Sequence, residues 1–134
     1  MHFARRHPRF RPLNEEEIHP GIKAALKHTA AREWFEAHEG LEAAWREARG
    51  PRRDTLQGMI HIVVAFEHVR RGNARSAATQ WTKAQKRLRA APDQFEGIDL
   101  ARWRRETEEF FDSSSERPFD PADAARAPQP QPSP

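Results

Sequence analysis

The chain has 134 residues, of which 37% are hydrophobic and 32% are charged, with a formal net charge of +3 and no cysteine. This length suits one domain, and a chain without cysteine has no disulfide framework, no thiolate metal site and no cysteine nucleophile. No apolar run approaches the roughly 20 residues of a membrane-spanning helix, and the arginine-rich start lacks the apolar stretch of a secretory signal, so we expect a cytoplasmic protein with no membrane partner.

Both ends of the chain have compositions that do not favour a packed core. Residues 1–13 combine four arginines with two prolines and predict a flexible basic arm. Residues 113–134 are rich in Ser, Pro, Ala and Gln and predict a disordered tail. The helical domain is therefore expected over residues 14–112.

Apolar periodicity and capping signals between these ends predict an all-α protein, a single compact bundle of four or five helices. The first clear helix begins near Pro20, because proline suits the first helical turn, and runs to about Lys27. The second is expected over about residues 31–49, where Gly50 and Pro51 provide a stop signal.

Three further helices are expected, over about residues 55–71, 74–90 and 100–112. The first of them is the most apolar segment of the chain, and we interpret it as a central helix that is buried on most sides. Asn73 and Asp99 can cap the other two, because their side chains accept hydrogen bonds from free amides at a helix start. The inner faces of the helices predict one core, which contains Trp34, Leu41, Trp45, Ile62, Phe66, Trp81 and Leu88.

The helix over residues 31–49 carries polar groups on its apolar side. At about 100° per residue, His38 and Glu42 fall among the tryptophans and leucine of that side. Burying charged groups is costly unless they are paired, so we expect partners elsewhere in the chain. His61 and His68 lie one above the other on the central helix, about 10 Å apart along its axis. We expect His38 and Glu42 to point into the same interior space as His68, with His61 at its edge.

Three motifs follow one another along the chain: Trp34-Phe35-x-Ala37-His38-Glu39-x-Leu41-Glu42-x-x-Trp45, Leu56-Gln57-Gly58-Met59-Ile60, and Ala65-x-x-His68-x-x-Arg71-Gly72-Asn73. Their order and separation resemble those of the bacterial and archaeal family called domain of unknown function 309, over about residues 22–90. The resemblance implies a small all-helical protein and brings no established activity. The family more often has glutamine where this chain has His61, so a site of three histidines would not be a family property.

Three interpretations of the polar residues stay open. The first is a buried hydrogen-bond network that fixes how the two central helices pack, since buried polar groups are usually satisfied by one another or by water. The second is a metal-free ligand or acid/base pocket, with Glu42 or Glu39 as the base and His38 or His68 as the acid. The residues assigned to a network or ligand site are His38, Glu39, Glu42, Gln57, His61, His68, Arg71 and Asn73.

The third interpretation is a divalent metal site in a hydrolase-like or redox protein. His38 and Glu42 are one helical turn apart and could ligate zinc, iron or manganese together with His61 or His68. The helix carries HExxE, whereas the zinc-protease motif requires HExxH, so that motif is not present. A divalent metal is the one cofactor that the pattern suggests.

Charge is distributed unevenly along the chain. Residues 51–91 carry nine Lys and Arg against two acids, whereas residues 92–134 carry five against ten. We expect the acidic end to meet the basic middle, which argues against a nucleic-acid partner. A basic-surface module that binds nucleic acid or protein is the alternative. The apolar central helix also suits burial against a second copy, so we expect that the chain can form a homodimer.

Overall fold

Five α-helices carry most of the described structure. The computed structural model describes residues 18–113 and 119–134, so the predicted arm over residues 1–13 lies outside them. The helices are α1 (Pro20–Ala30), α2 (Trp34–Glu47), α3 (Gly50–Arg70), α4 (Ala74–Arg87) and α5 (Leu100–Asp112). A short hairpin of β1 (Gln94–Phe95) and β2 (Ile98–Asp99) precedes α5, and a 3-10 helix, η4 (Pro121–Arg126), follows it. The predicted all-α bundle is confirmed.

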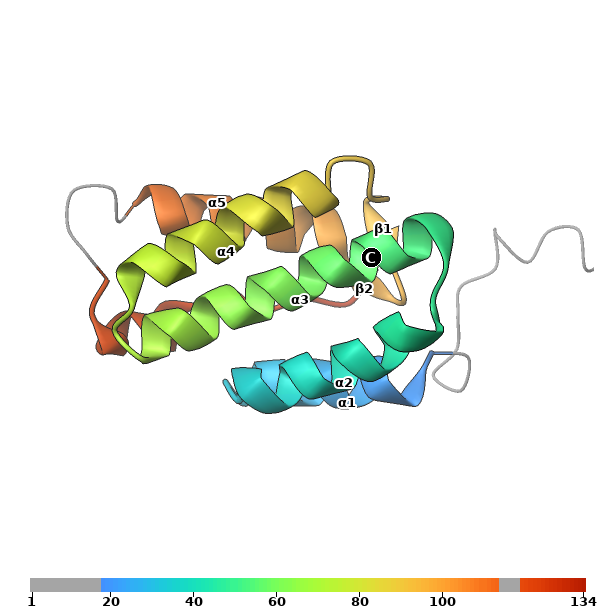
Figure 1. Ribbon diagram of the computed structural model, residues 1–134, viewed down its shortest axis with the longest axis horizontal. Helices are drawn as coiled ribbons and strands as arrows, with labels where there is room; N and C mark the ends of the chain where they lie inside the picture. The colour runs from blue at the N-terminus through green and yellow to red at the C-terminus, as the bar shows by residue number, and fades with distance from the viewer. Residues whose placement is uncertain (1–17, 114–118) are drawn as a thin grey trace, which may run out of the picture.

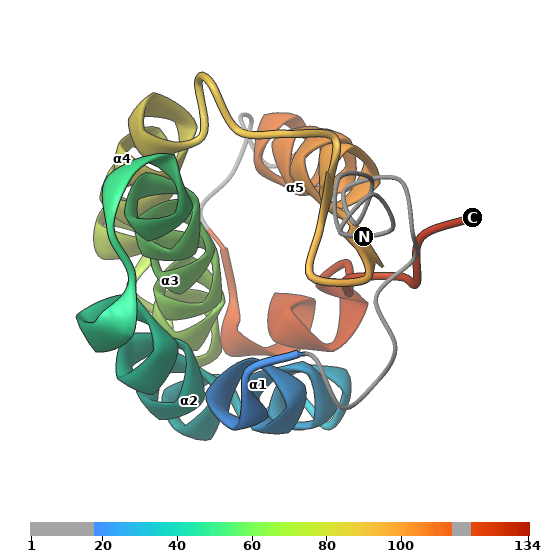
Figure 2. The same ribbon diagram turned by 90° about the vertical axis from the view of Figure 1, so that its right-hand side faces the viewer.

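The first four helices follow one another around an arc. Figure 1 shows α3 between α2 and α4, and the end view in Figure 2 places α5 and η4 on the inner side of the arc. Helix α3 packs against α2, α4 and η4, and about half of its 21 residues are buried, as expected for a central helix. None of the helices in the described residues is long and apolar enough to cross a membrane.

Capping and proline signals set the helix starts. Asn73 accepts a hydrogen bond from the amide of Ser76 at 3.3 Å, and Asp99 accepts one from the amide of Arg102 at 3.0 Å, so both predicted caps are confirmed. Helix α3 begins at Gly50, earlier than predicted, directly after a short extended link. The Gly-Pro pair that ends one helix also starts the next, because proline lacks only an amide that the first turn leaves unpaired.

Helices α1 and α2 cross with their backbones in contact. A Cβ atom at Gly40 would lie 2.5 Å from the carbonyl oxygen of Gly21, and a Cβ at Gly21 would meet the carbonyl oxygen of Gly40. His19 caps α1 by accepting a hydrogen bond from the amide of Gly21 at 2.9 Å. The pair of glycines therefore sets how closely the two helices approach.

Six of the seven predicted core residues are buried in one hydrophobic cluster, and Trp45 is the exception. Trp45 packs against the core but is partly exposed, and the guanidinium of Arg53 lies 3.8 Å from the centre of its ring. Its aromatic face is thus covered by a cation instead of by the interior. The buried six are Trp34, Leu41, Ile62, Phe66, Trp81 and Leu88.

The predicted disorder of residues 113–134 is wrong for residues 119–134, which are packed against the bundle. Phe119 is buried, and its ring lies 5.1 Å from that of Phe110 and 5.2 Å from that of Phe111. Asp120 and Asp123 cap η4 reciprocally. An apolar anchor and a capped helix thus supply the stability that the composition alone did not indicate.

Backbone and side-chain hydrogen bonds tie the remainder of this segment to distant elements. The amide of Asp99 donates to the carbonyl of Gln131 at 2.8 Å, and the amide of Ser133 donates to the carbonyl of Gly97 at 2.9 Å. The side chain of Gln129 donates to the carbonyl of Ala30, at the end of α1, at 3.1 Å. We call residues 119–134 the C-terminal strap, because they join the hairpin to the opposite side of the bundle.

Candidate functional site

The predicted polar pair on α2 forms, but it is partly exposed. Nε2 of His38 lies 3.3 Å from Oε2 of Glu42, and the two side chains are 28% and 35% exposed. Oε1 of Glu42 accepts a hydrogen bond from Arg46 at 2.5 Å, and Glu39 is exposed. The pair is therefore less buried than predicted, and Arg46, one turn further along α2, supplies a partner for Glu42.

The second polar group joins α3 to α4. Nδ1 of His61 lies 2.7 Å from the side-chain oxygen of Gln80, and its Nε2 lies 3.3 Å from the side-chain nitrogen of Gln57. Burial lowers the pKa of His61 below 6.5, the hydrogen bond with Gln80 acts in the opposite direction, and the charges of Lys83 and Arg87 lower it further. A neutral histidine that bridges two helices is a structural link.

His68 makes no side-chain hydrogen bond to either group in the described residues. Its Nδ1 is buried without a hydrogen-bond partner, and its backbone carbonyl accepts from the amide of Asn73 at 2.8 Å. Within residues 18–113 and 119–134, no hydrogen bond or ion pair joins His68 to His38, Glu39 or Glu42, and the interior space that these residues were expected to share stays a prediction.

The predicted metal ligands are not assembled into one site. No group of three His, Asp or Glu side chains that could hold a metal ion occurs in the described parts of the chain. His61 bonds to Gln80 of α4, whereas His38 and Glu42 lie at a partly exposed edge of α2. The four predicted ligands are His38, Glu42, His61 and His68.

The most deeply buried carboxylate outside the C-terminal strap is Glu67, near the end of α3. It is 8% exposed and accepts hydrogen bonds from Arg70 at 2.9 and 2.6 Å and from Nε of Arg71 at 2.8 Å. The hydrogen bonds from Arg70 lower the pKa of Glu67 below 4.5, burial acts against them, and Arg71 adds to the lowering. Glu67 is therefore an ionised anchor that fixes the positions of two arginines.

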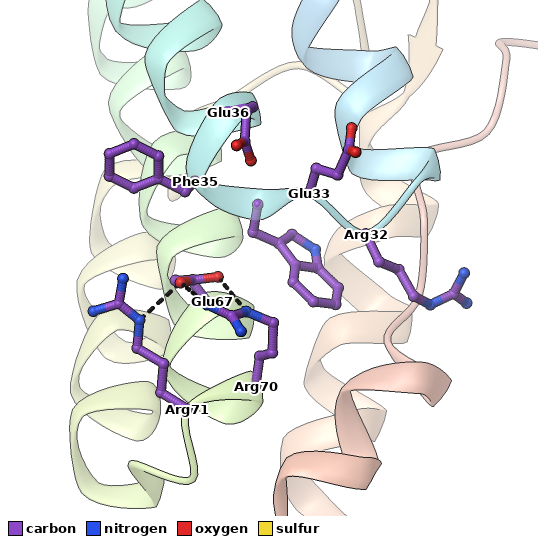
Figure 3. A pocket seen from close by; sticks show the side chains of 8 residues that line it. Arg32, Glu33, Phe35, Glu36, Glu67, Arg70 and Arg71 are labelled. Atoms are coloured by element: carbon purple, nitrogen blue, oxygen red, sulfur yellow. Dashed lines mark hydrogen bonds and ion pairs between the residues drawn. The ribbon is translucent and has the colours of Figure 1, made fainter.

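These three residues line a hollow of about 430 Å³ between α3 and the start of α2. Figure 3 shows Glu33 and Glu36 on one side of it and the arginines of α3 on the other. A volume of this size lies within the range of small-molecule sites, which is about 300–1,000 Å³. The lining residues are Arg32, Glu33, Trp34, Phe35, Glu36, Glu67, Arg70 and Arg71.

Aromatic side chains form the apolar part of the hollow. Trp34 is only 2% exposed and contributes a wall that belongs to the core. Phe35 is 51% exposed and is the one large apolar side chain that the described residues leave open to solvent. An exposed phenylalanine beside fixed charges provides an apolar contact for a ligand that the charges orient.

Several charged groups of the hollow are already paired and others are free. Glu33 is bound by Nδ1 of His28 at 2.8 Å. Arg71 uses only its Nε on Glu67, so its two terminal nitrogens keep their hydrogen-bonding capacity. The side chains of Arg32 and Glu36 make no hydrogen bond or ion pair in the described residues. With respect to the described residues, the hollow thus offers donors without a partner at Arg32 and at the terminal nitrogens of Arg71, and a carboxylate without a partner at Glu36.

The fold and the hollow define a small helical domain with a charged, partly aromatic site where two of its helices meet. Residues 22–80 match the family model described as "Domain of unknown function (DUF309)", which confirms the resemblance drawn from the sequence motifs. All eight residues that line the hollow fall within the matched range. No curated protein and no solved structure matches the chain significantly.

One predicted site residue, Arg71, lines the hollow, and a second, Asn73, caps the next helix. Sequence reasoning missed Glu67 and Arg70. A signal for them was present, because an acid inside an apolar helical run is followed three and four residues later by two arginines. That spacing places all three on one side of the helix, where the acid can be paired.

Proposed function

We propose that the protein binds a small molecule and that the hollow between α2 and α3 recognises an anionic group of this ligand. One observation carries the proposal: Glu67 is 8% exposed, yet it holds Arg70 and Arg71, which are about half exposed, at the edge of the hollow. A buried carboxylate is costly unless it is paired, so its place beneath two arginines favours a built arrangement over a chance surface pair.

Preorganisation explains why this arrangement favours binding. An arginine side chain loses about 2 kcal/mol of rotamer entropy when it is fixed, and here the fold has already fixed Arg70 and Arg71 through Glu67. Two cations share one carboxylate, so one positive charge is left over. The free terminal nitrogens of Arg71 can donate to a ligand carboxylate or phosphate as a planar fork.

Binding of aromatic carboxylates tests this proposal. We expect millimolar benzoate and N-acetyl-L-phenylalanine to shift the amide NMR signals of Phe35, Glu36 and Arg71 in the full chain. Arg71→Gln should weaken binding about tenfold, which corresponds to the loss of one charge-assisted hydrogen bond. Arg75→Gln is the matched control, since Arg75 is exposed on α4 and does not line the hollow. Equal binding by both variants, or shifts confined to other residues, would refute the proposal.

In this proposal, hydrogen bonds of His61 support the site by holding its helix in place. The Gln57, His61 and Gln80 side chains link α3 to α4 and so support the helix that carries the arginines. The homodimer stays a prediction, as does the cytoplasmic location.

A second candidate function rests on the basic end of the α3–α4 pair. An ion pair between Arg52 and Glu96 joins the basic middle of the chain to its acidic end. A second hollow, of about 360 Å³, is lined by Lys86, Arg87 and Arg89, and only Arg87 among them has an ion-pair partner in the described residues. This observation favours a phosphate-rich partner over a neutralised surface.

Fluorescence titration with single- and double-stranded oligonucleotides at physiological salt tests this second candidate. Salt-dependent binding that weakens in Lys86→Gln and Arg89→Gln variants would support it. Undetectable binding, or binding that these changes leave unaltered, would refute the second candidate and show that the basic residues form a solvated face.

A further inference from the structure

Opposite charges face each other across the hollow without touching. Glu36 and Arg70 both line it, but no ion pair within 4.0 Å joins Glu36 to either arginine of α3 in the described residues. Glu36 is nevertheless close enough to act on Arg70. The pKa of Arg70 is raised first by its hydrogen bonds to Glu67, then by the charge of Glu67, and additionally by the more distant charge of Glu36.

The carboxylates of the hollow differ in their availability. Glu67 is occupied by Arg70 and Arg71, and Glu33 is occupied by His28. Glu36 is exposed and unpaired among the described residues, so it is the acid that can receive a positive group of a ligand. In the close-up of Figure 3, its carboxylate lies on the opposite side of the hollow from the guanidinium groups of α3.

A ligand that carries only an anionic group leaves the carboxylate of Glu36 without an opposite charge. If it bound the terminal nitrogens of Arg71, the free carboxylate of Glu36 would face it with the same sign of charge. A ligand that carries a cation as well as an anion would satisfy both sides, because each of its charges would meet an opposite one. The exposed ring of Phe35 lines the same hollow and offers contact to an apolar substituent.

We propose that the ligand is a zwitterion of the α-amino-acid type with an apolar side chain. Its carboxylate binds Arg71, its ammonium group binds Glu36, and its side chain packs on Phe35. This inference rests on the proposed function, since it requires that the hollow binds small molecules. A hollow of about 430 Å³ has room for one such molecule together with the water that completes its hydration.

Three ligands with the same side chain separate the contributions of the two charges. L-Phenylalanine carries both charges, N-acetyl-L-phenylalanine carries only the carboxylate, and L-phenylalanine amide carries only the ammonium group at slightly acidic pH. Titrations of the full chain, followed by amide NMR shifts, should give L-phenylalanine an affinity about tenfold higher than that of either analogue, as expected for one additional charge pair.

Two variants and one matched control assign the charges to residues. Glu36→Gln should weaken L-phenylalanine binding about tenfold and leave N-acetyl-L-phenylalanine unchanged or slightly stronger. Arg71→Gln should weaken both ligands. Glu109→Gln removes an exposed acid from α5, outside the hollow, and should change neither affinity. Thermal melts of each variant show that the fold is retained.

The outcomes distinguish this inference from the proposed function. If N-acetyl-L-phenylalanine binds as tightly as L-phenylalanine and Arg71→Gln weakens both, the anion site stands and the zwitterion inference is refuted. If none of the three ligands shifts the amides of the hollow, both proposals fail. Tighter binding of the dipeptide glycyl-L-phenylalanine than of L-phenylalanine would refute the assignment to a single amino acid.

Discussion

The close crossing of α1 and α2 predicts that Gly40→Ala destabilises the protein, although helix propensity predicts the opposite. Gly40 lies within α2, where replacing glycine by alanine would ordinarily stabilise an exposed helix by about 1 kcal/mol. Here the added Cβ would lie 2.5 Å from the carbonyl oxygen of Gly21, and ordinary contacts begin near 3.4 Å. The obstacle is backbone, which cannot rotate away.

The size of the effect follows from this geometry. Helices α1 and α2 would have to separate by about 1 Å, and they would give up part of the packing around Ala25, which the new Cβ also approaches at 3.3 Å. Inserting a methyl group into a packed interface costs about 1–3 kcal/mol. Subtracting the gain in propensity of about 1 kcal/mol leaves a range of about 0–2 kcal/mol, and because the obstacle is backbone we expect a net loss of about 2 kcal/mol in the free energy of unfolding.

Urea denaturation followed by tryptophan fluorescence measures this loss. Glu39→Ala is the control, because it changes the neighbouring exposed residue and should stay within about 0.5 kcal/mol of the wild type. In the double variant Gly21→Ala/Gly40→Ala the two costs should not add, since the helices have already separated. A Gly40→Ala protein that is more stable than the wild type would show that the backbones are not in contact.

Three further changes test other parts of the structure. Glu67→Gln should lower the free energy of unfolding by about 2 kcal/mol at neutral pH through its charge-assisted hydrogen bonds. Because the folded state lowers the pKa of Glu67, this stabilisation is fully present above pH 4.5 and is lost as the pH falls through the lower pKa of the folded state. The unfolding free energies of the wild type and Glu67→Gln should therefore converge in acid. His61 also has a lowered pKa, and the wild type should therefore lose stability as pH falls below 6.5, whereas His61→Gln should show a flatter pH profile in the same melts. Phe119→Ala should cost about 2–4 kcal/mol in urea melts, because its ring packs on two others, and an effect under about 0.5 kcal/mol would mean that the C-terminal strap does not contribute to the fold.

Local signals were sufficient to predict the helices. Proline at the start of α1 and the side-chain caps at Asn73 and Asp99 act within one helical turn, so they can be recognised without knowing the fold. The Gly50-Pro51 pair was ambiguous for the same reason, since its stop and start functions look alike in sequence. The ordered structure of the C-terminal strap depends on contacts with distant residues, and these cannot be predicted from local composition.

The candidate site was harder to predict from the sequence than the fold. Helix wheels showed that His38 and Glu42 lie near the apolar side of α2 but did not show that this edge of the helix reaches solvent. Glu67 is the one acid in an apolar run, so its sequence context alone does not mark it as part of a site. Its two arginine partners are local, yet the hollow beside them exists only because the start of α2 packs next to the end of α3.

The contacts of the C-terminal strap join residues that are far apart in the chain, and this separation sets when they form during folding. Its Gln129 reaches Ala30 across 99 positions of the chain, and its Phe119 covers the rings of α5. Contacts over such separations form late, because a long loop must close before they contribute. Until residues 119–134 have packed, Phe110 and Phe111 lack the contact with Phe119. A folding intermediate in which the C-terminal strap has not yet packed is thus exposed to aggregation through these rings.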